Sequence, residues 1–80
     1  MNTEAVFAKL QMVFDDVFPD PVPLTPELTP KDVPAWDSML HISLVVAMEQ
    51  AFAIRFKLGE VESTGNVGNL VELIRRKVSE

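Results

Sequence analysis

All six prolines of this 80-residue sequence lie between positions 19 and 34. Proline has no backbone N–H and its ring clashes with the preceding helical turn, so no long helix can pass through this stretch. A connection over residues 19–36 is therefore expected, and a loop of this length in a small domain is commonly functional. It also contains apolar residues, and we expect Leu24, Leu28 and Val33 to hold it against the helices.

Helical periodicity marks the segments on either side of this connection. Over residues 3–18, apolar side chains recur at intervals of three and four, which places them on one helical stripe. Pro19 ends that helix, because the residue before proline avoids helical backbone angles. A last helix is predicted over residues 67–78 with Asn66 as its N-cap, and one short helical turn around residues 60–63.

A further helix should begin at Asp37 or Ser38 and end at Phe52 or Ala53, with Asp37 as its N-cap. The predicted fold is all-α: a small four-helix bundle, with three main helices, a short third helix and the long Pro-rich loop between helices 1 and 2. We expect one domain over residues 1–80, since a chain this short supports a single core. The core is predicted to include Phe14, Leu44, Met48, Phe52 and Ile74.

Composition and charge exclude several classes of function. Without cysteine there is no disulfide framework, and one histidine with scattered carboxylates shows no metal-ligand spacing, so no metal site is predicted. A net charge of −5 disfavours nucleic acid as a partner. No apolar run approaches the roughly 20 residues of a membrane span, and the first residues lack the basic stretch of a secretory signal. We expect a monomer in the cytoplasm.

The predicted helix after the loop has two apolar faces. The face expected to pack on the other helices holds Leu44, Val45, Met48, Ala51 and Phe52. The opposite face holds Ser38, Met39, Ile42, Val46, Glu49 and Gln50. A domain of this size cannot easily bury both, so the second face should remain exposed as a contact surface. The alternative is that the loop of residues 19–36 folds over this face and hides it.

Ser38 lies in the first turn of this helix. Free backbone N–H groups and the positive end of the helix dipole favour an attached phosphate there. Serine is also common at helix starts simply because it caps them. From its position alone, capping is the preferred interpretation.

Four segments together resemble one known family. Trp36-Asp37-Ser38-Met39, which follows the Pro-rich loop, resembles the prosthetic-group site of acyl carrier proteins. Residues 44–49 resemble the family's second helix, and Phe52-Ala53-Ile54 resembles the Phe-Gly-Ile at its end. Residues 66–70 resemble the Thr-Val-Gly-Asp that opens its last helix. The similarity extends over nearly the whole chain, in the same order and spacing.

This resemblance implies that Ser38, preceded by the motif residue Asp37, carries 4′-phosphopantetheine derived from coenzyme A. The chain would then hold an acyl or aminoacyl group as a thioester for partner enzymes, without being an enzyme itself and without catalytic residues of its own. The implied partners are a phosphopantetheinyl transferase and a ligase, synthase or transferase that loads the cargo. The residues expected to contact partners are Met39, Ile42, Val46 and Glu49.

Several positions depart from the family pattern. Met39 stands where leucine is usual, and Ala53 and Asn69 replace a frequent glycine and aspartate. Leu40 and Ser43 occupy positions that are often acidic in carriers of fatty-acid synthesis. We therefore hypothesise a specialised carrier with a dedicated partner enzyme.

Two other functions are compatible with parts of this sequence. A serine hydrolase could use Ser38 with His41, but such a pair also needs a group that orients the base and an oxyanion site. We therefore expect His41 to pack or to form hydrogen bonds. The second alternative is a helical protein-interaction module without a prosthetic group, which would use Met39, Ile42 and Val46 as its contact surface.

Overall fold

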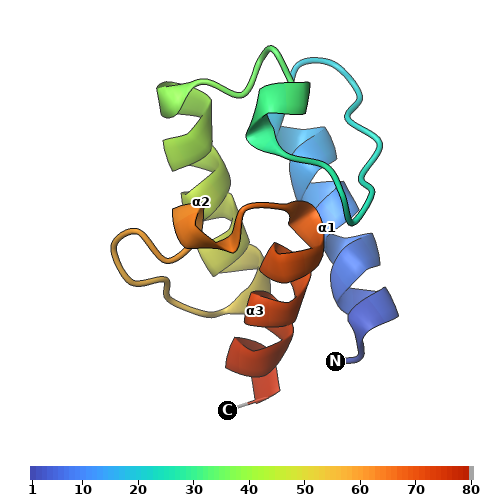
Figure 1. Cartoon of the computed structure of the whole chain (residues 1–80). Helices are drawn as coiled ribbons and strands as arrows, with labels where there is room; N and C mark the ends of the chain where they lie inside the picture. The colour runs from blue at the N-terminus through green and yellow to red at the C-terminus, as the bar shows by residue number, and fades with distance from the viewer. Residues whose placement is uncertain (80) are drawn as a thin grey trace.

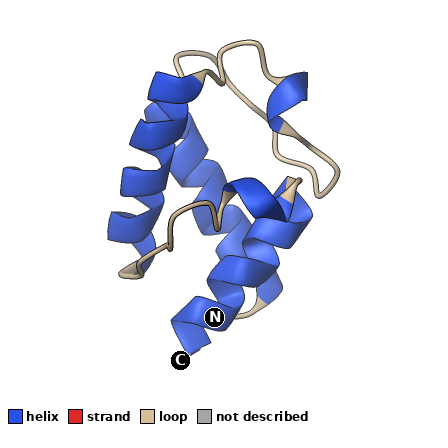
Figure 2. Cartoon of the chain, turned by 60° about the vertical axis from the view of Figure 1, so that its left-hand side comes forward, coloured by secondary structure: helices blue, strands red, loops and turns tan. Residues whose placement is uncertain are grey.

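The computed structural model describes residues 1–79 and contains three α-helices, α1 (Thr3–Val17), α2 (Ser38–Phe52) and α3 (Val67–Ser79). Two short 3-10 helices, η1 (Pro30–Asp32) and η2 (Glu62–Thr64), lie in the connections. α1 packs against both α2 and α3 (Figure 1). Figure 2 shows only helices and loops in the described part of the chain. The predicted all-α fold is confirmed.

The predicted four-helix bundle needs one correction, because the fourth element is not an α-helix. The short turn expected around residues 60–63 is η2, a single 3-10 turn. The hydroxyl of Thr64 donates to the carbonyl of Val61, which satisfies that carbonyl within the turn. Gly65 then adopts a φ of 81°, a left-handed conformation that favours glycine and ends the element.

The capping residues explain where the helices begin and end. Asp37 Oδ1 accepts the backbone N–H of Leu40 at 2.9 Å, so α2 begins at the predicted position. Asn66 Oδ1 accepts the N–H of Asn69 at 2.8 Å, as expected for the N-cap of α3. At the end of α2, Ala53 takes a left-handed conformation with a φ of 54°.

The core lies between the three α-helices and extends under the loop. All five residues predicted for it are buried. In the described part of the chain, the buried residues are Val6, Leu10, Val13, Phe14, Phe18, Val22, Leu24, Val33, Leu44, Met48, Phe52, Val61, Val67, Leu70, Val71 and Ile74. None of the helices in the described chain is long and apolar enough to cross a membrane.

Gln11 in α1 fixes the first half of the Pro-rich loop. Its side-chain amide donates to the carbonyl of Val22 and accepts from the N–H of Leu24, both at 2.9 Å. Leu24 and Val33 are buried, and Leu28 packs against the core while half-buried. The prediction that these three side chains hold the loop against the helices is confirmed.

The second half of the loop joins the start of α3. The N–H groups of Val67 and Gly68 donate to the carbonyls of Leu28 and Pro26, each at 2.9 Å. These are N–H groups of the first helical turn, which no carbonyl inside the helix can satisfy. The loop therefore completes α3, and its position near the start of that helix is set by backbone hydrogen bonds.

Candidate functional site

Ser38 is the first residue of α2, and its side chain is exposed. Two backbone hydrogen bonds shape the entry to the helix, from Trp36 N–H to Val33 O at 3.0 Å and from Asp37 N–H to Ala35 O at 2.9 Å. Within residues 1–79, the hydroxyl of Ser38 makes no hydrogen bond. It therefore stands at a fixed helix start with its oxygen open to solvent.

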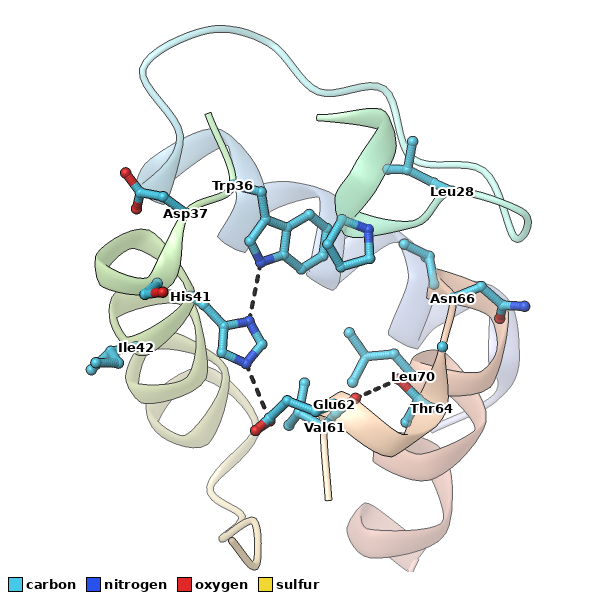
Figure 3. A pocket seen from close by; sticks show the side chains of 14 residues that line it. Leu28, Trp36, Asp37, His41, Ile42, Val61, Glu62, Thr64, Asn66 and Leu70 are labelled. Atoms are coloured by element: carbon cyan, nitrogen blue, oxygen red, sulfur yellow. Dashed lines mark hydrogen bonds and ion pairs between the residues drawn. The ribbon is translucent and has the colours of Figure 1, made fainter. Parts of the chain in front are cut away.

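A pocket of about 470 Å³ opens beside Ser38. Its wall comes from four parts of the chain: the Pro-rich loop, the first turns of α2, the segment that includes η2, and the start of α3 (Figure 3). Its apolar lining residues are Leu28, Pro30, Trp36, Ile42, Val61, Val67 and Leu70. The pocket is thus apolar on most sides, with the predicted attachment residue at its edge.

Apart from Ser38, the polar side chains that line this pocket already hold hydrogen bonds. Asp37 Oδ1 and Asn66 Oδ1 each cap a helix, and the hydroxyl of Thr64 donates to a carbonyl at 2.6 Å. His41 and Glu62, the remaining polar pair, contact one another with 3.2 Å between Nε2 and Oε1. No buried side-chain nitrogen or oxygen is without a partner in the described chain.

Trp36, His41 and Glu62 form a linear set of hydrogen bonds along one side of the pocket, which we call the strap (Figure 3). The indole N–H of Trp36 donates to His41 Nδ1 at 3.1 Å. In a neutral imidazole, the proton must then lie on Nε2, from which it can be donated to Glu62. The expected hydrogen-bonding role of His41 is confirmed. Neither ring nitrogen is directed at Ser38, so the pair does not form a nucleophile and base.

Trp36 also contacts the aromatic core. Its ring lies edge-on to Phe14 and Phe18, with centroid distances of 5.4 and 5.6 Å. The sequence placed Trp36 in the motif around Ser38, but its link through His41 to Glu62 was missed. One available signal was that an indole N–H in a partly buried position requires an acceptor, and His41 is the only histidine.

The outer face of α2, formed by Met39, Ile42 and Val46, is exposed. These side chains are 80%, 64% and 47% exposed, respectively. The alternative that the loop folds over this face is wrong. Glu49, also predicted to contact partners, is half-buried, and its Oε2 accepts the N–H of Phe56 at 2.8 Å.

Charged pairs lie away from the pocket, near the end of α3. Lys77 Nζ contacts Glu60 Oε1 at 2.9 Å, and the backbone N–H of Lys57 donates to the same oxygen at 2.8 Å. The pKa of Glu60 is lowered mainly by the hydrogen bond from the Lys57 N–H and, to a smaller extent, by the hydrogen bond from Lys77. Among residues 1–79, no three His, Asp or Glu side chains are grouped so as to hold a metal ion.

Comparison with known proteins gives one informative match. No family profile and no curated protein sequence matches the chain. Among solved structures, it is similar to a holo acyl carrier protein from Geobacter metallireducens, with 38% sequence identity and a TM-score of 0.74. The alignment covers 96% of this chain and 85% of that one. On this evidence the chain belongs to the acyl carrier protein family, whose members are carriers and not enzymes.

Proposed function

We propose that this chain carries an acyl group as a thioester on 4′-phosphopantetheine attached to the hydroxyl of Ser38. The main support is the geometry of Ser38, which is exposed at the start of α2, follows the capping residue Asp37 and borders an apolar pocket. Its hydroxyl has no competing hydrogen bond in the described chain. The similar Geobacter protein is described as a holo form, which supports the same interpretation.

Attachment is a phosphoryl transfer that a separate transferase catalyses. Ser38 Oγ attacks the β-phosphorus of coenzyme A, the new P–O bond forms, and 3′,5′-ADP leaves while the transferase accepts the serine proton. The start of α2 favours the phosphate through its dipole and its free N–H groups. This chain supplies no base, because both ring nitrogens of His41 are engaged elsewhere. When bound, the prosthetic group supplies the thiol that forms the thioester.

The pocket favours an aliphatic acyl group over an aminoacyl group as cargo. Its walls are apolar on most sides, and burial of a hydrocarbon chain there is favourable. An ammonium group would find only the carboxylates of Asp37 and Glu62, and each of these already accepts a hydrogen bond. A charged group that lacks a dedicated partner is costly to desolvate.

The outer face of α2 is the proposed contact surface for partner enzymes. Met39 and Ile42 lie within about one helical turn of Ser38, so a partner that contacts them is close to the attachment point. The partners are a phosphopantetheinyl transferase and the ligase, synthase or transferase that loads the cargo. Glu49 lies beside Val46 in the same region, although its carboxylate also accepts the Phe56 N–H.

Intact-mass measurement tests this function. The purified chain is incubated with coenzyme A and a promiscuous phosphopantetheinyl transferase, and we expect one added prosthetic group. Ser38→Ala should gain none, whereas Ser43→Ala, which removes another exposed serine of α2, should still gain one. Modification of Ser38→Ala would contradict the proposal. A wild-type chain that is never modified would favour the interaction module based on Met39, Ile42 and Val46.

A further inference from the structure

The strap is the only hydrogen-bonded link between α2 and residues 61–66 in the described chain. We propose that it controls access to the pocket, with His41 as a positioning residue that sets how often a carried acyl chain lies inside. This inference rests on the function proposed for Ser38 and concerns the regulation of that same site.

Two walls of the pocket are held by contacts other than the bond between His41 and Glu62. Trp36 is held by its edge-on contacts with Phe14 and Phe18. The start of α3 is held to the loop by the hydrogen bond from Val67 N–H to Leu28 O. Widening of the pocket to admit a chain must therefore occur mainly between α2 and η2, which is the gap that the strap crosses.

The strap also lies on the path from the attachment point. Ser38 and His41 are three residues apart on α2, so they share one flank of the helix, and both line the pocket. Figure 3 shows the imidazole of His41 projecting from α2 into the pocket, between Trp36 and Glu62. A chain tethered at Ser38 has to pass this ring to reach the buried side chains of Val61 and Leu70.

The two halves of the strap differ in strength. The Trp36–His41 bond is partly buried and leaves the imidazole proton on the nitrogen that faces Glu62. The side chain of Glu62 is 58% exposed, and exposed pairs of this kind shift an equilibrium by only a few-fold. The outer bond can therefore open when an acyl chain enters, while the inner bond keeps the ring in place.

The test compares wild type, Glu62→Ala and Asp16→Ala, each purified in the unmodified form. A promiscuous phosphopantetheinyl transferase transfers octanoyl-phosphopantetheine from octanoyl coenzyme A to Ser38 of each chain, and 3′,5′-ADP leaves. Cleavage of the thioester by hydroxylamine reports how well the chain is sheltered. Glu62→Ala should be cleaved about 2- to 5-fold more slowly than wild type, because the pocket opens more readily. Asp16→Ala removes an exposed acid from α1 and should match wild type. Equal rates for Glu62→Ala and wild type would overturn the proposal, as would faster cleavage.

A second measurement separates this inference from the function of Ser38. The apolar dye N-phenyl-1-naphthylamine is titrated into the unmodified chain, so no loading is needed. Glu62→Ala and His41→Leu should bind the dye about 2- to 5-fold more tightly than wild type or Asp16→Ala. If the chain cannot be loaded with octanoyl, the proposed carrier function is contradicted, but the role of the strap is not. If the dye affinity is unchanged in both strap variants, the role of the strap is contradicted, but the carrier function is not.

Discussion

The N–H of Gly68 in α3 donates to the carbonyl oxygen of Pro26 at 2.9 Å, which joins the Pro-rich loop directly to the last helix. A Cβ atom on Gly68 would lie 3.1 Å from that oxygen and 3.2 Å from the Pro26 Cβ. The loop can approach α3 this closely only because position 68 has no side chain. This contact also places Leu28, two residues further along the loop, at the pocket wall.

Gly68→Ala should therefore destabilise the protein by about 1 kcal/mol, although alanine normally stabilises a helix relative to glycine. The rigid backbone at Pro26 has to move away or lose its hydrogen bond to relieve the contact. Urea unfolding provides the measurement. Ser43→Ala, at an exposed position inside α2, is the control and should leave stability unchanged or slightly raised. An equally stable Gly68→Ala variant would show that the loop adapts without loss.

Phe52 supports the packing of α2 on α1. Its ring is 6% exposed, and the ammonium of Lys9 lies 5.3 Å from the ring centroid. Phe52→Ala should cost about 3 to 5 kcal/mol, a large part of the stability of a domain of this size. Met39→Ala, at a side chain that is 80% exposed, should change stability by less than about 0.5 kcal/mol. A loss below about 1 kcal/mol for Phe52→Ala in chemical unfolding would contradict a core role.

The lowered pKa of Glu60 predicts a pH dependence of stability. The carboxylate accepts hydrogen bonds from Lys57 N–H and Lys77, so the folded state favours the charged form. Its stabilising contribution is present above the ordinary pKa of 4.5 and is lost as the pH falls through the lower folded value. Glu60→Gln should flatten the decrease in melting temperature below about pH 4.5. Glu27→Gln, an exposed acid in the loop, should leave that decrease unchanged, and an identical curve for both variants would rule out this role.

Much of the fold could be predicted because its determinants are local. The cap formed by Asp37 and the proline after Phe18 set helix ends within a few residues of sequence. Periodicity also predicted that α2 has two apolar faces. Because a small domain has no further helix to cover the second face, its exposure could be predicted as well. The short turn around residues 60–63 was predicted as a helix, since nothing in its composition distinguishes one 3-10 turn from one α-helical turn.

The pocket could not be predicted because it depends on contacts between distant residues. Glu62 meets His41, and Gly68 meets Pro26, only after α2 and α3 have packed on α1. No spacing pattern in the sequence predicts either of these contacts. The candidate attachment residue was identified from a motif, whereas the wall beside it required the tertiary structure.

The low charge of α2 is expected to decide which enzymes this carrier serves. Glu49 is the one acidic residue of α2, and its carboxylate accepts the Phe56 N–H, while Met39, Ile42 and Val46 are uncharged. Electrostatic steering by bases on an enzyme should therefore be weak here, and association should depend little on salt. We expect a fatty-acid-synthesis transacylase to transfer malonyl groups to the holo protein much more slowly than to the host's housekeeping carrier. This outcome would support a specialised carrier with a dedicated partner.

Restoring charge at the right positions provides the decisive comparison. Leu40 packs against the core, so a carboxylate there would be desolvated, whereas Ser43 and Val46 are exposed. The double variant Ser43→Glu, Val46→Glu should raise the transfer rate several-fold, with the gain lost at high salt. Ala8→Glu, Met12→Glu adds the same charge to the exposed side of α1 and should have little effect. A wild-type transfer rate equal to that of the housekeeping carrier would refute the specialised role. An equal gain in both double variants would mean that the overall charge of the protein, and not the charge on α2, controls recognition.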